Sequence, residues 1–305
     1  MTRDASEHLE KMIWHDNEHL QIGDTSFLVT LDPAIWNTTE STPERFLMDK
    51  NWWLVESNLE YFPETIQNMI EIGIFKGGSI ALYEQLFSPA RLVGVDIQTD
   101  RVSALDRYLE RRLATERVRL YYGIDQQDRQ ALRSIAHENF RDQPLDLVID
   151  AASHLYEPSK TSLNVFLPLL RPGGVYLIED WGWAHWQNSY EEYGAASYAD
   201  EKRPLTKLIF EAAMLAASRP GIISNVFIDS GRAFLTRGSE VLMDEDFEIS
   251  DAYLTRLWHM EFSAKTRPVD TLKRWVPLSF RKRVPPSIAA WVHEHVPHQW
   301  PVLRG

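Results

Sequence analysis

Glycine and acidic residues cluster at the ends of several short apolar runs in this chain. The first of these ends reads EIGIFKGGS, from Glu71 to Ser79, and contains Gly73, Gly77 and Gly78. A glycine-rich turn lets a ligand approach the backbone closely. Its spacing is not the G-x-G-x-x-G of dinucleotide-binding turns, and Glu71 would repel a pyrophosphate. The turn therefore favours a cationic ligand, although Gly77 and Gly78 could also serve only as turn glycines.

Two later run ends add carboxylates to this picture. VGVDI contains Asp96, which could accept both hydroxyls of a ribose. The next run is followed by Asp125, which could meet an adenine amino group or could simply cap a helix. Together with Glu71 they form an acidic cup that suits a cationic nucleoside without phosphates. The residues predicted to bind this cofactor are Glu71, Gly73, Lys76, Gly77, Ser79, Asp96, Ile97, Asp125 and Asp150.

Groups suited to proton transfer and metal binding follow two further runs. VIDAASH leads from Asp150 to His154, and YLIED ends in Glu179 and Asp180. Carboxylate oxygens suit Mg²⁺, and an imidazole can take up a proton near neutral pH. We expect His154 and Asp150 to be catalytic, and Glu179, Asp180 and Asp150 to be the candidate metal ligands.

An aromatic cluster follows the Glu-Asp pair directly, in the segment WGWAHWQ. Indole faces stack well on sugar rings and other flat apolar surfaces. We therefore expect Trp181, Trp183 and His185 to line the pocket for an acceptor molecule. Two alternatives remain open: the indoles could be ordinary core residues, and His185 could be a second base, a replacement metal ligand or a packing residue.

The elements that would position these residues alternate regularly along the chain. Short apolar runs predict seven strands, and helical spacing predicts five helices between them. This pattern predicts an α/β fold with a doubly wound, mostly parallel seven-stranded sheet that ends in an antiparallel hairpin. The predicted strands are 68–75, 91–97, 118–123, 144–151, 175–180, 222–228 and 231–237, and the predicted helices are 79–87, 99–116, 127–137, 160–170 and 205–218.

Extensions flank this predicted domain on both sides. We expect a helical or lid-like extension over 1–66, the cofactor-binding domain over 67–238, and a C-terminal extension over 239–305. In the first extension, Trp52 and Trp53 could form a lid or could pack in the core. From residue 265 onward the chain carries eight basic and two acidic residues, with interleaved aromatics. This tail could make peripheral contact with a membrane, but packing on the acidic body is favoured.

Composition excludes several classes of function. The chain of 305 residues has a net charge of −12, which does not favour general nucleic-acid binding. With no cysteine, disulfides, thiolate nucleophiles and cysteine-bound zinc are excluded. No apolar segment is long enough to span a membrane, and the N-terminus lacks the apolar stretch of a secretory signal. We expect a cytoplasmic location.

The pattern E-x-G-x-x-x-G-G-S, the acidic Asp96 and the terminal hairpin resemble class I S-adenosylmethionine-dependent methyltransferases over residues 66–238. Within that class, LDLVIDxxSH and FLPLLRPGGVYLIED resemble the macrocin- and mycinamicin-type sugar O-methyltransferases and their cephalosporin-hydroxylase-like relatives. The resemblance implies S-adenosylmethionine as cofactor, a hydroxyl of a sugar or glycoside as acceptor, and a homo-oligomer. It also implies that His154 is the base and that Glu179 and Asp180 bind Mg²⁺.

One departure from that family pattern affects the metal site. The family's second Asp in I-D-D-G-S-H is Ala151 here, and its Gly is Ala152. Asp150 or another residue could substitute, the site could bind metal weakly, or an enzyme without metal could rely on His154. Three other functions also stay open: a catalytically silent partner subunit, a nicotinamide-dependent oxidoreductase, and a membrane-surface protein recruited by its tail.

Overall fold

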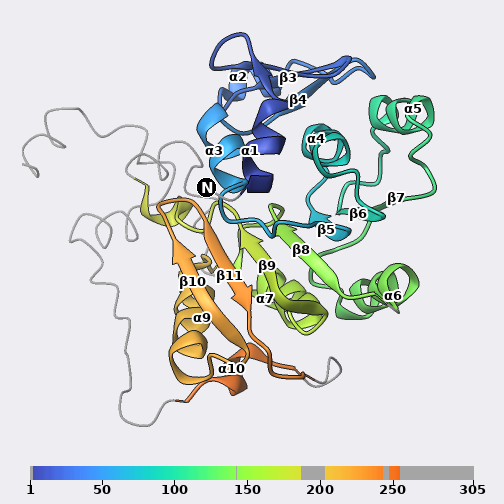
Figure 1. Cartoon of the computed structure of the whole chain (residues 1–305). Coiled ribbons are helices and arrows are strands. Elements are labelled where there is room, and N and C mark those ends of the chain that lie inside the picture. Colours follow the sequence, from blue (N-terminus) through green and yellow to red (C-terminus); the bar gives the residue numbers. More distant parts are fainter. Residues whose placement is uncertain (1–2, 142, 187–202, 243–246, 255–305) are drawn as a thin grey trace, which may run out of the picture. The chain divides into compact units, whose positions relative to one another are not determined.

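The computed structural model describes residues 3–141, 143–186, 203–242 and 247–254 (Figure 1). The described residues belong to one compact unit. The basic tail lies outside the described residues. In the part that is described, no helix is long and apolar enough to cross a membrane.

A seven-stranded sheet in the order β10-β11-β9-β8-β5-β6-β7 forms the centre of this unit. Neighbouring strands are parallel except around β11, which pairs antiparallel with both β9 and β10. This confirms the predicted sheet and its terminal hairpin. The strands are β5 (Asn68–Ile72), β6 (Arg91–Asp96), β7 (Val118–Tyr122), β8 (Leu145–Asp150), β9 (Leu170–Ile178), β10 (Ile223–Ile228) and β11 (Ala233–Arg237).

Helices cover both faces of this sheet and create two apolar cores (Figure 1). Every residue of β5 and β8 is buried, as expected for strands that are covered on both sides. One core contains side chains of α4 (Gly78–Phe87) and α5 (Ser103–Arg111). The other contains side chains of α6 (Arg129–Phe140), α7 (Tyr156–Phe166), α9 (Thr206–Ser218) and the short α10 (Ile249–Ala252).

The N-terminal segment corrects the expectation of a mainly helical extension. It contains a second sheet of four strands, β1 (Ile13–Trp14), β2 (His19–Ile22), β3 (Thr25–Val29) and β4 (Arg45–Met48). Three helices accompany it, α1 (Arg3–Glu10), α2 (Pro33–Trp36) and α3 (Trp52–Asn58). Phe27 and Phe46 of this sheet belong to the same apolar core as α4 and α5. The extension is therefore built onto one face of the central sheet.

Tandem tryptophans at the start of α3 pack in neither of the predicted ways. Trp52 is 39% exposed and Trp53 is 46% exposed, so neither ring is a core residue. Neither lines the cavity described below. The Arg232 guanidinium lies 4.7 Å from the ring centroid of Trp53, a cation–π contact to the β10–β11 hairpin. Trp53 thus contributes to a contact between α3 and that hairpin.

Candidate active site

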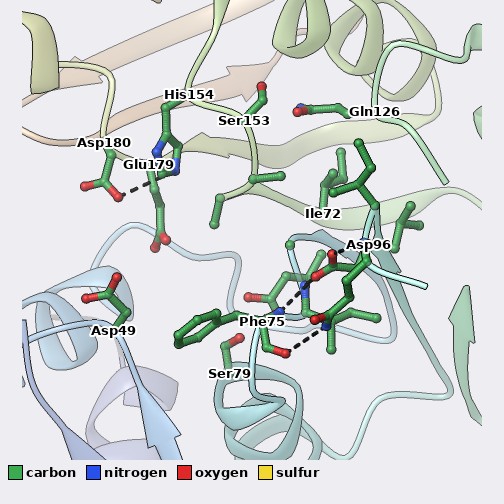
Figure 2. Close-up of a pocket in the computed structure, with 18 of the residues that line it drawn as sticks. Asp49, Ile72, Phe75, Ser79, Asp96, Gln126, Ser153, His154, Glu179 and Asp180 are labelled. Carbon is green, nitrogen blue, oxygen red and sulfur yellow. Dashed lines mark hydrogen bonds and ion pairs between the residues drawn. The ribbon is translucent and has the colours of Figure 1, made fainter. Parts of the chain in front are cut away.

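The carboxyl ends of β5, β6, β8 and β9, together with the segment after β4, surround a cavity of about 540 Å³. This is the position at which open α/β sheets bind ligands. Figure 2 shows Asp96 and Gln126 at one end of the cavity. Asp49, His154, Glu179 and Asp180 gather at the other end. The cavity thus separates a cofactor end from an end rich in groups that can act on an acceptor.

The backbone of the turn after β5 has no room for a side chain at two of its glycines. Gly73 has φ 107°, and a Cβ there would lie 2.6 Å from the carbonyl oxygen of Ala151. A Cβ on Gly78 would lie 2.3 Å from the carbonyl oxygen of Leu47. Gly73 and Gly78 line the cavity, whereas Gly77 does not line it and adopts a left-handed conformation. The predicted turn therefore brings backbone, without side chains, to the cavity wall.

Glu71 is the buried carboxylate of the cofactor end. It is 1% exposed, lines the cavity, and its Oε2 has no hydrogen-bond partner among the described residues. Burial raises the pKa of Glu71 to about 8, while the Lys50 charge and a hydrogen bond from Ser79 act in the opposite direction. A buried acceptor without a partner is costly in free energy. Glu71 is therefore suited to a ligand that brings a cationic donor.

Asp96 holds the turn as well as facing the cavity. Its Oδ2 accepts hydrogen bonds from the backbone N–H groups of Ile74 at 2.7 Å and Phe75 at 2.9 Å. Its Oδ1 accepts from the backbone N–H of Gln98 at 2.8 Å. Since a carboxylate offers about four acceptor positions, capacity for a ligand hydroxyl remains. Ile97, exposed beside Asp96, also lines the cavity as predicted.

Gln126 follows Asp125 and is a cavity residue that the sequence did not predict. It lies in a polar segment in which no pattern distinguishes a buried amide from an exposed one. Asp125 lines the cavity, but α6 is capped by Asp128, which corrects the helix-cap alternative for Asp125. Gln126 is 5% exposed and also lines the cavity. Its Nε2 donates to Asp150, and its Oε1 is buried without a hydrogen-bond partner in the described part of the chain. This oxygen is a second acceptor available to a ligand.

Asp150 lies in a buried network and is not among the residues that line the cavity, so its catalytic, cofactor-binding and metal-binding roles stay predictions. It accepts hydrogen bonds from Gln126 Nε2 at 2.7 Å, Ser162 Oγ at 2.9 Å and Tyr176 Oη at 3.3 Å. Burial raises the pKa of Asp150, and the hydrogen bonds from Ser162 and Gln126 oppose that shift. The Asp150 side chain points into this network and away from the cavity because neighbouring side chains of a strand face opposite sides. Asp150 thus holds Gln126 in place.

His154 and Asp180 face each other at the acceptor end (Figure 2). The distance from His154 Nε2 to Asp180 Oδ2 is 3.6 Å, and this Nε2 makes no hydrogen bond within the described residues. Both residues adopt left-handed backbone conformations, with φ 54° and 53°. Such strain in non-glycine residues concentrates at functional sites. Burial raises the pKa of Asp180, and the His154 charge opposes this shift.

Glu179 is engaged by Lys50, a residue that no sequence pattern singles out. The two form a buried ion pair, with Glu179 6% and Lys50 8% exposed. Asn58 Nδ2 also donates to Glu179 Oε1 at 3.4 Å, and Arg232 fixes that amide by donating to Asn58 Oδ1 at 2.6 Å. Burial disfavours the charged ammonium, but the Glu179 carboxylate together with Tyr83 and Glu71 outweighs this effect, so the pKa of Lys50 is raised. Glu179 therefore already has a cationic partner.

The arrangement of the candidate metal ligands does not fit the predicted Mg²⁺ site. Ala151 offers only a methyl group, Asp150 faces the buried network, and Glu179 is paired with Lys50. Among the residues that the structure describes, no three His, Asp or Glu side chains are placed to hold a metal ion together. The carboxylate of Asp180 alone would be a weak ligand set.

Four further residues of the predicted site do not line the cavity. Lys76 Nζ donates to the carbonyl oxygen of Thr39 at 2.6 Å. Trp181 and Trp183 donate their indole N–H groups to the carbonyl oxygens of Asp229 and His154. His185 Nε2 contacts Thr206 Oγ1 at 2.6 Å. The roles expected of these four residues stay predictions; the tryptophans anchor the turn after β9 and thereby support His154. The segment 187–202 that follows lies outside the described residues.

Comparisons with known proteins agree with this geometry. Residues 70–181 match the family model described as a methyltransferase domain. Demethylmacrocin O-methyltransferase of Streptomyces fradiae is 34% identical over 134 residues, which cover 42% of this chain and 30% of that protein. Mycinamicin VI 2''-O-methyltransferase of Micromonospora griseorubida is 34% identical over 125 residues, which cover 39% and 28%. The chain thus spans less than half the length of these relatives in the matched region.

Solved structures of methyltransferases also align with the chain. A complex of the MycE methyltransferase of the mycinamycin pathway with Mg, SAH and mycinamycin VI aligns with 68% of this chain and 52% of its own. The TM-score is 0.46 and the sequence identity is 23%.

Proposed function

We propose that this chain, whose residues 70–181 match a methyltransferase domain, transfers a methyl group from S-adenosylmethionine to a hydroxyl of a small-molecule acceptor. One observation carries the proposal. A single cavity joins an unpartnered buried carboxylate oxygen of Glu71 to an imidazole nitrogen of His154 that makes no hydrogen bond within the described residues. The first suits a cationic cofactor, and the second suits the removal of a proton.

The cofactor end offers acceptors for the amino group, a ribose hydroxyl and the adenine amino group of S-adenosylmethionine. Glu71 would accept the amino group, and Asp96 would accept a ribose hydroxyl with its remaining capacity. Gln126 Oε1 would accept the adenine amino group. Gly73 and Gly78 contribute backbone to the wall of this end of the cavity. When bound, this cofactor supplies an electrophilic methyl group.

The acceptor end would bind and deprotonate the hydroxyl. His154 Nε2 would take the proton as the acceptor oxygen attacks, and Asp180, 3.6 Å away, would stabilise the imidazolium that results. The indole of Trp183 donates to the carbonyl oxygen of His154 at 2.8 Å and so keeps the strained residue in place. Orientation of the two reacting groups also contributes to the rate enhancement.

The acceptor class comes from the relatives. Two relatives are named as O-methyltransferases of demethylmacrocin and of mycinamicin VI, and a third, from Streptomyces antibioticus, is named L-olivosyl-oleandolide 3-O-methyltransferase. We therefore propose a sugar hydroxyl of a glycoside or related natural product as the acceptor. A homo-oligomer and a cytoplasmic location remain predictions.

The proposal is tested by methyl transfer from radiolabelled S-adenosylmethionine to a panel of glycosides, with the same compounds lacking the free hydroxyl as controls. Label in the acceptor that depends on His154 supports the proposal. Binding of S-adenosylhomocysteine without turnover on any hydroxylated acceptor would instead support a catalytically silent partner subunit.

A further inference from the structure

We propose that the Lys50 ammonium supplies the fixed positive charge at the acceptor end of the cavity, so that methyl transfer by this chain needs no divalent metal ion. This inference rests on the proposed function, and it deepens it by assigning a role to a residue outside the predicted site. Its starting point is the mismatch between the predicted Mg²⁺ ligands and their arrangement.

The Lys50–Glu179 pair joins two distant parts of the chain at the cavity. Lys50 follows β4 of the N-terminal sheet, and Glu179 follows β9 of the central sheet. Both side chains are buried and both line the cavity. A buried charge that loses its partner is strongly unfavourable, so the pair will persist. The positive charge is therefore a fixed part of the cavity wall.

Glu179 is not free to turn toward a metal ion. Its Oε2 accepts a hydrogen bond from Lys50 and its Oε1 accepts one from Asn58, so the direction of the carboxylate is fixed from both sides. Arg232 holds the same Asn58 through its Oδ1 and is itself bound to Asp229. A rotation of the Glu179 side chain would break these buried hydrogen bonds. The Glu179 carboxylate is thus held in its contact with the Lys50 ammonium.

Lys50 retains donors for a ligand. An ammonium group has three N–H donors, and Glu179 is its hydrogen-bond acceptor within the described residues. Because Lys50 and His154 line the same cavity, a remaining donor can bind the acceptor oxygen while Nε2 takes its proton. In that step the acceptor O–H bond breaks, the proton goes to His154, and the oxygen forms its new bond to the methyl carbon as the sulfur–carbon bond breaks. No further reactant is needed.

A competing arrangement would use Asp49 in place of the missing carboxylate at Ala151. Asp49 lies across from Glu179 and Asp180 in Figure 2. Burial raises the pKa of Asp49, and the neighbouring Asp180 charge raises it further. A divalent ion between Asp49 and Asp180 would relieve that repulsion. The two arrangements make opposite predictions about metal binding.

The experiment measures binding of Mn²⁺, as a spectroscopic substitute for Mg²⁺, to the full chain by electron paramagnetic resonance. Each sample is also titrated with S-adenosylhomocysteine. We expect the wild-type chain to bind no stoichiometric Mn²⁺, and its affinity for S-adenosylhomocysteine to be unchanged by EDTA. The double variant Lys50→Met with Ala151→Asp frees Glu179 and restores a carboxylate, so it should gain one Mn²⁺ per chain. Lys50→Arg with Ala151→Asp, which keeps the positive charge, is the matched control and should gain none.

Two results would overturn the inference. One is a stoichiometric Mn²⁺ site in the wild-type chain that is lost in Asp49→Asn or Glu179→Gln. The other is a double variant that is folded by thermal melting but gains no ion. Absence of S-adenosylhomocysteine binding would instead contradict the proposed function, so the two failures are distinguishable.

Discussion

The pH dependence of cofactor affinity is expected to follow the ionisation of Glu71. Its pKa of about 8 means that the free protein carries a neutral carboxyl group near pH 7. A cationic amino group binds the carboxylate, so binding below pH 8 must release a proton from Glu71. Affinity should therefore rise as the pH rises toward 8, and it should level off above that value.

The magnitude follows from the ionised fraction. With a pKa of about 8, roughly one molecule in a hundred has the carboxylate at pH 6.0, and roughly one in four has it at pH 7.5. The affinity for S-adenosylhomocysteine should thus increase about twentyfold over this interval, in which the ligand's own amino group stays mostly protonated. Titration calorimetry in buffers of different ionisation enthalpy would measure both the affinity and the released proton.

Two controls isolate the carboxyl group. Glu71→Gln should bind more weakly at pH 7.5 and show a nearly flat profile. Methylthioadenosine, which lacks the amino-acid part of the cofactor, should also show a flat profile with the wild-type chain. An unchanged affinity in Glu71→Gln, together with a flat wild-type profile, would refute the assignment of Glu71 to the amino group.

Three further predictions concern the turn, the base and the ribose contact. Asp96→Ala should weaken S-adenosylhomocysteine binding by at least about a hundredfold, because it removes charge-assisted hydrogen bonds to the ligand and to the turn. An unchanged affinity in calorimetry would contradict the assignment of Asp96 to the ribose. His154→Ala should keep that affinity within a few fold and lower turnover by about 10²- to 10⁴-fold, and retained turnover would require another base. Gly78→Ala should lower the free energy of unfolding by more than about 2 kcal/mol, because its Cβ would clash with the Leu47 carbonyl. Gly231→Ala is the control, because its Cβ would have its nearest neighbour at 3.8 Å. It should change the free energy of unfolding, measured by urea denaturation, by less than about 1 kcal/mol. Equal effects of the two substitutions would contradict the predicted clash.

The central sheet was predictable from the sequence because its strands are buried on both faces. The runs around Ile70 and Val148 are mostly apolar and lack regular alternation of polar and apolar residues, and in a chain with alternating helices this pattern is typical of buried parallel strands. The N-terminal sheet was not predictable in the same way. β1 has only two residues, and β4 lacks regular alternation of buried and exposed positions. Its stability comes from packing on the face of α4 and α5, which no local pattern reveals.

The candidate site was predictable where a residue type has one evident use. Glu71, Asp96 and His154 line the cavity as expected, since polar residues at strand ends meet at one edge of the sheet. The side of the sheet that the Asp150 side chain faces depends on strand alternation next to a turn, and the sequence does not determine it. Lys50 carries no local sign of burial, because its partner Glu179 lies far along the chain. Long-range pairing of this kind emerges only in the folded structure.

The most direct test of the proposed cofactor site is a calorimetric titration of the full chain with S-adenosylhomocysteine at pH 8, with NADH titrated in parallel. We expect saturable binding of one S-adenosylhomocysteine per chain and no binding of NADH, because the buried Glu71 accepts an amino group and repels a pyrophosphate. Binding of NADH without binding of S-adenosylhomocysteine would contradict the methyltransferase assignment and would favour a nicotinamide-dependent oxidoreductase.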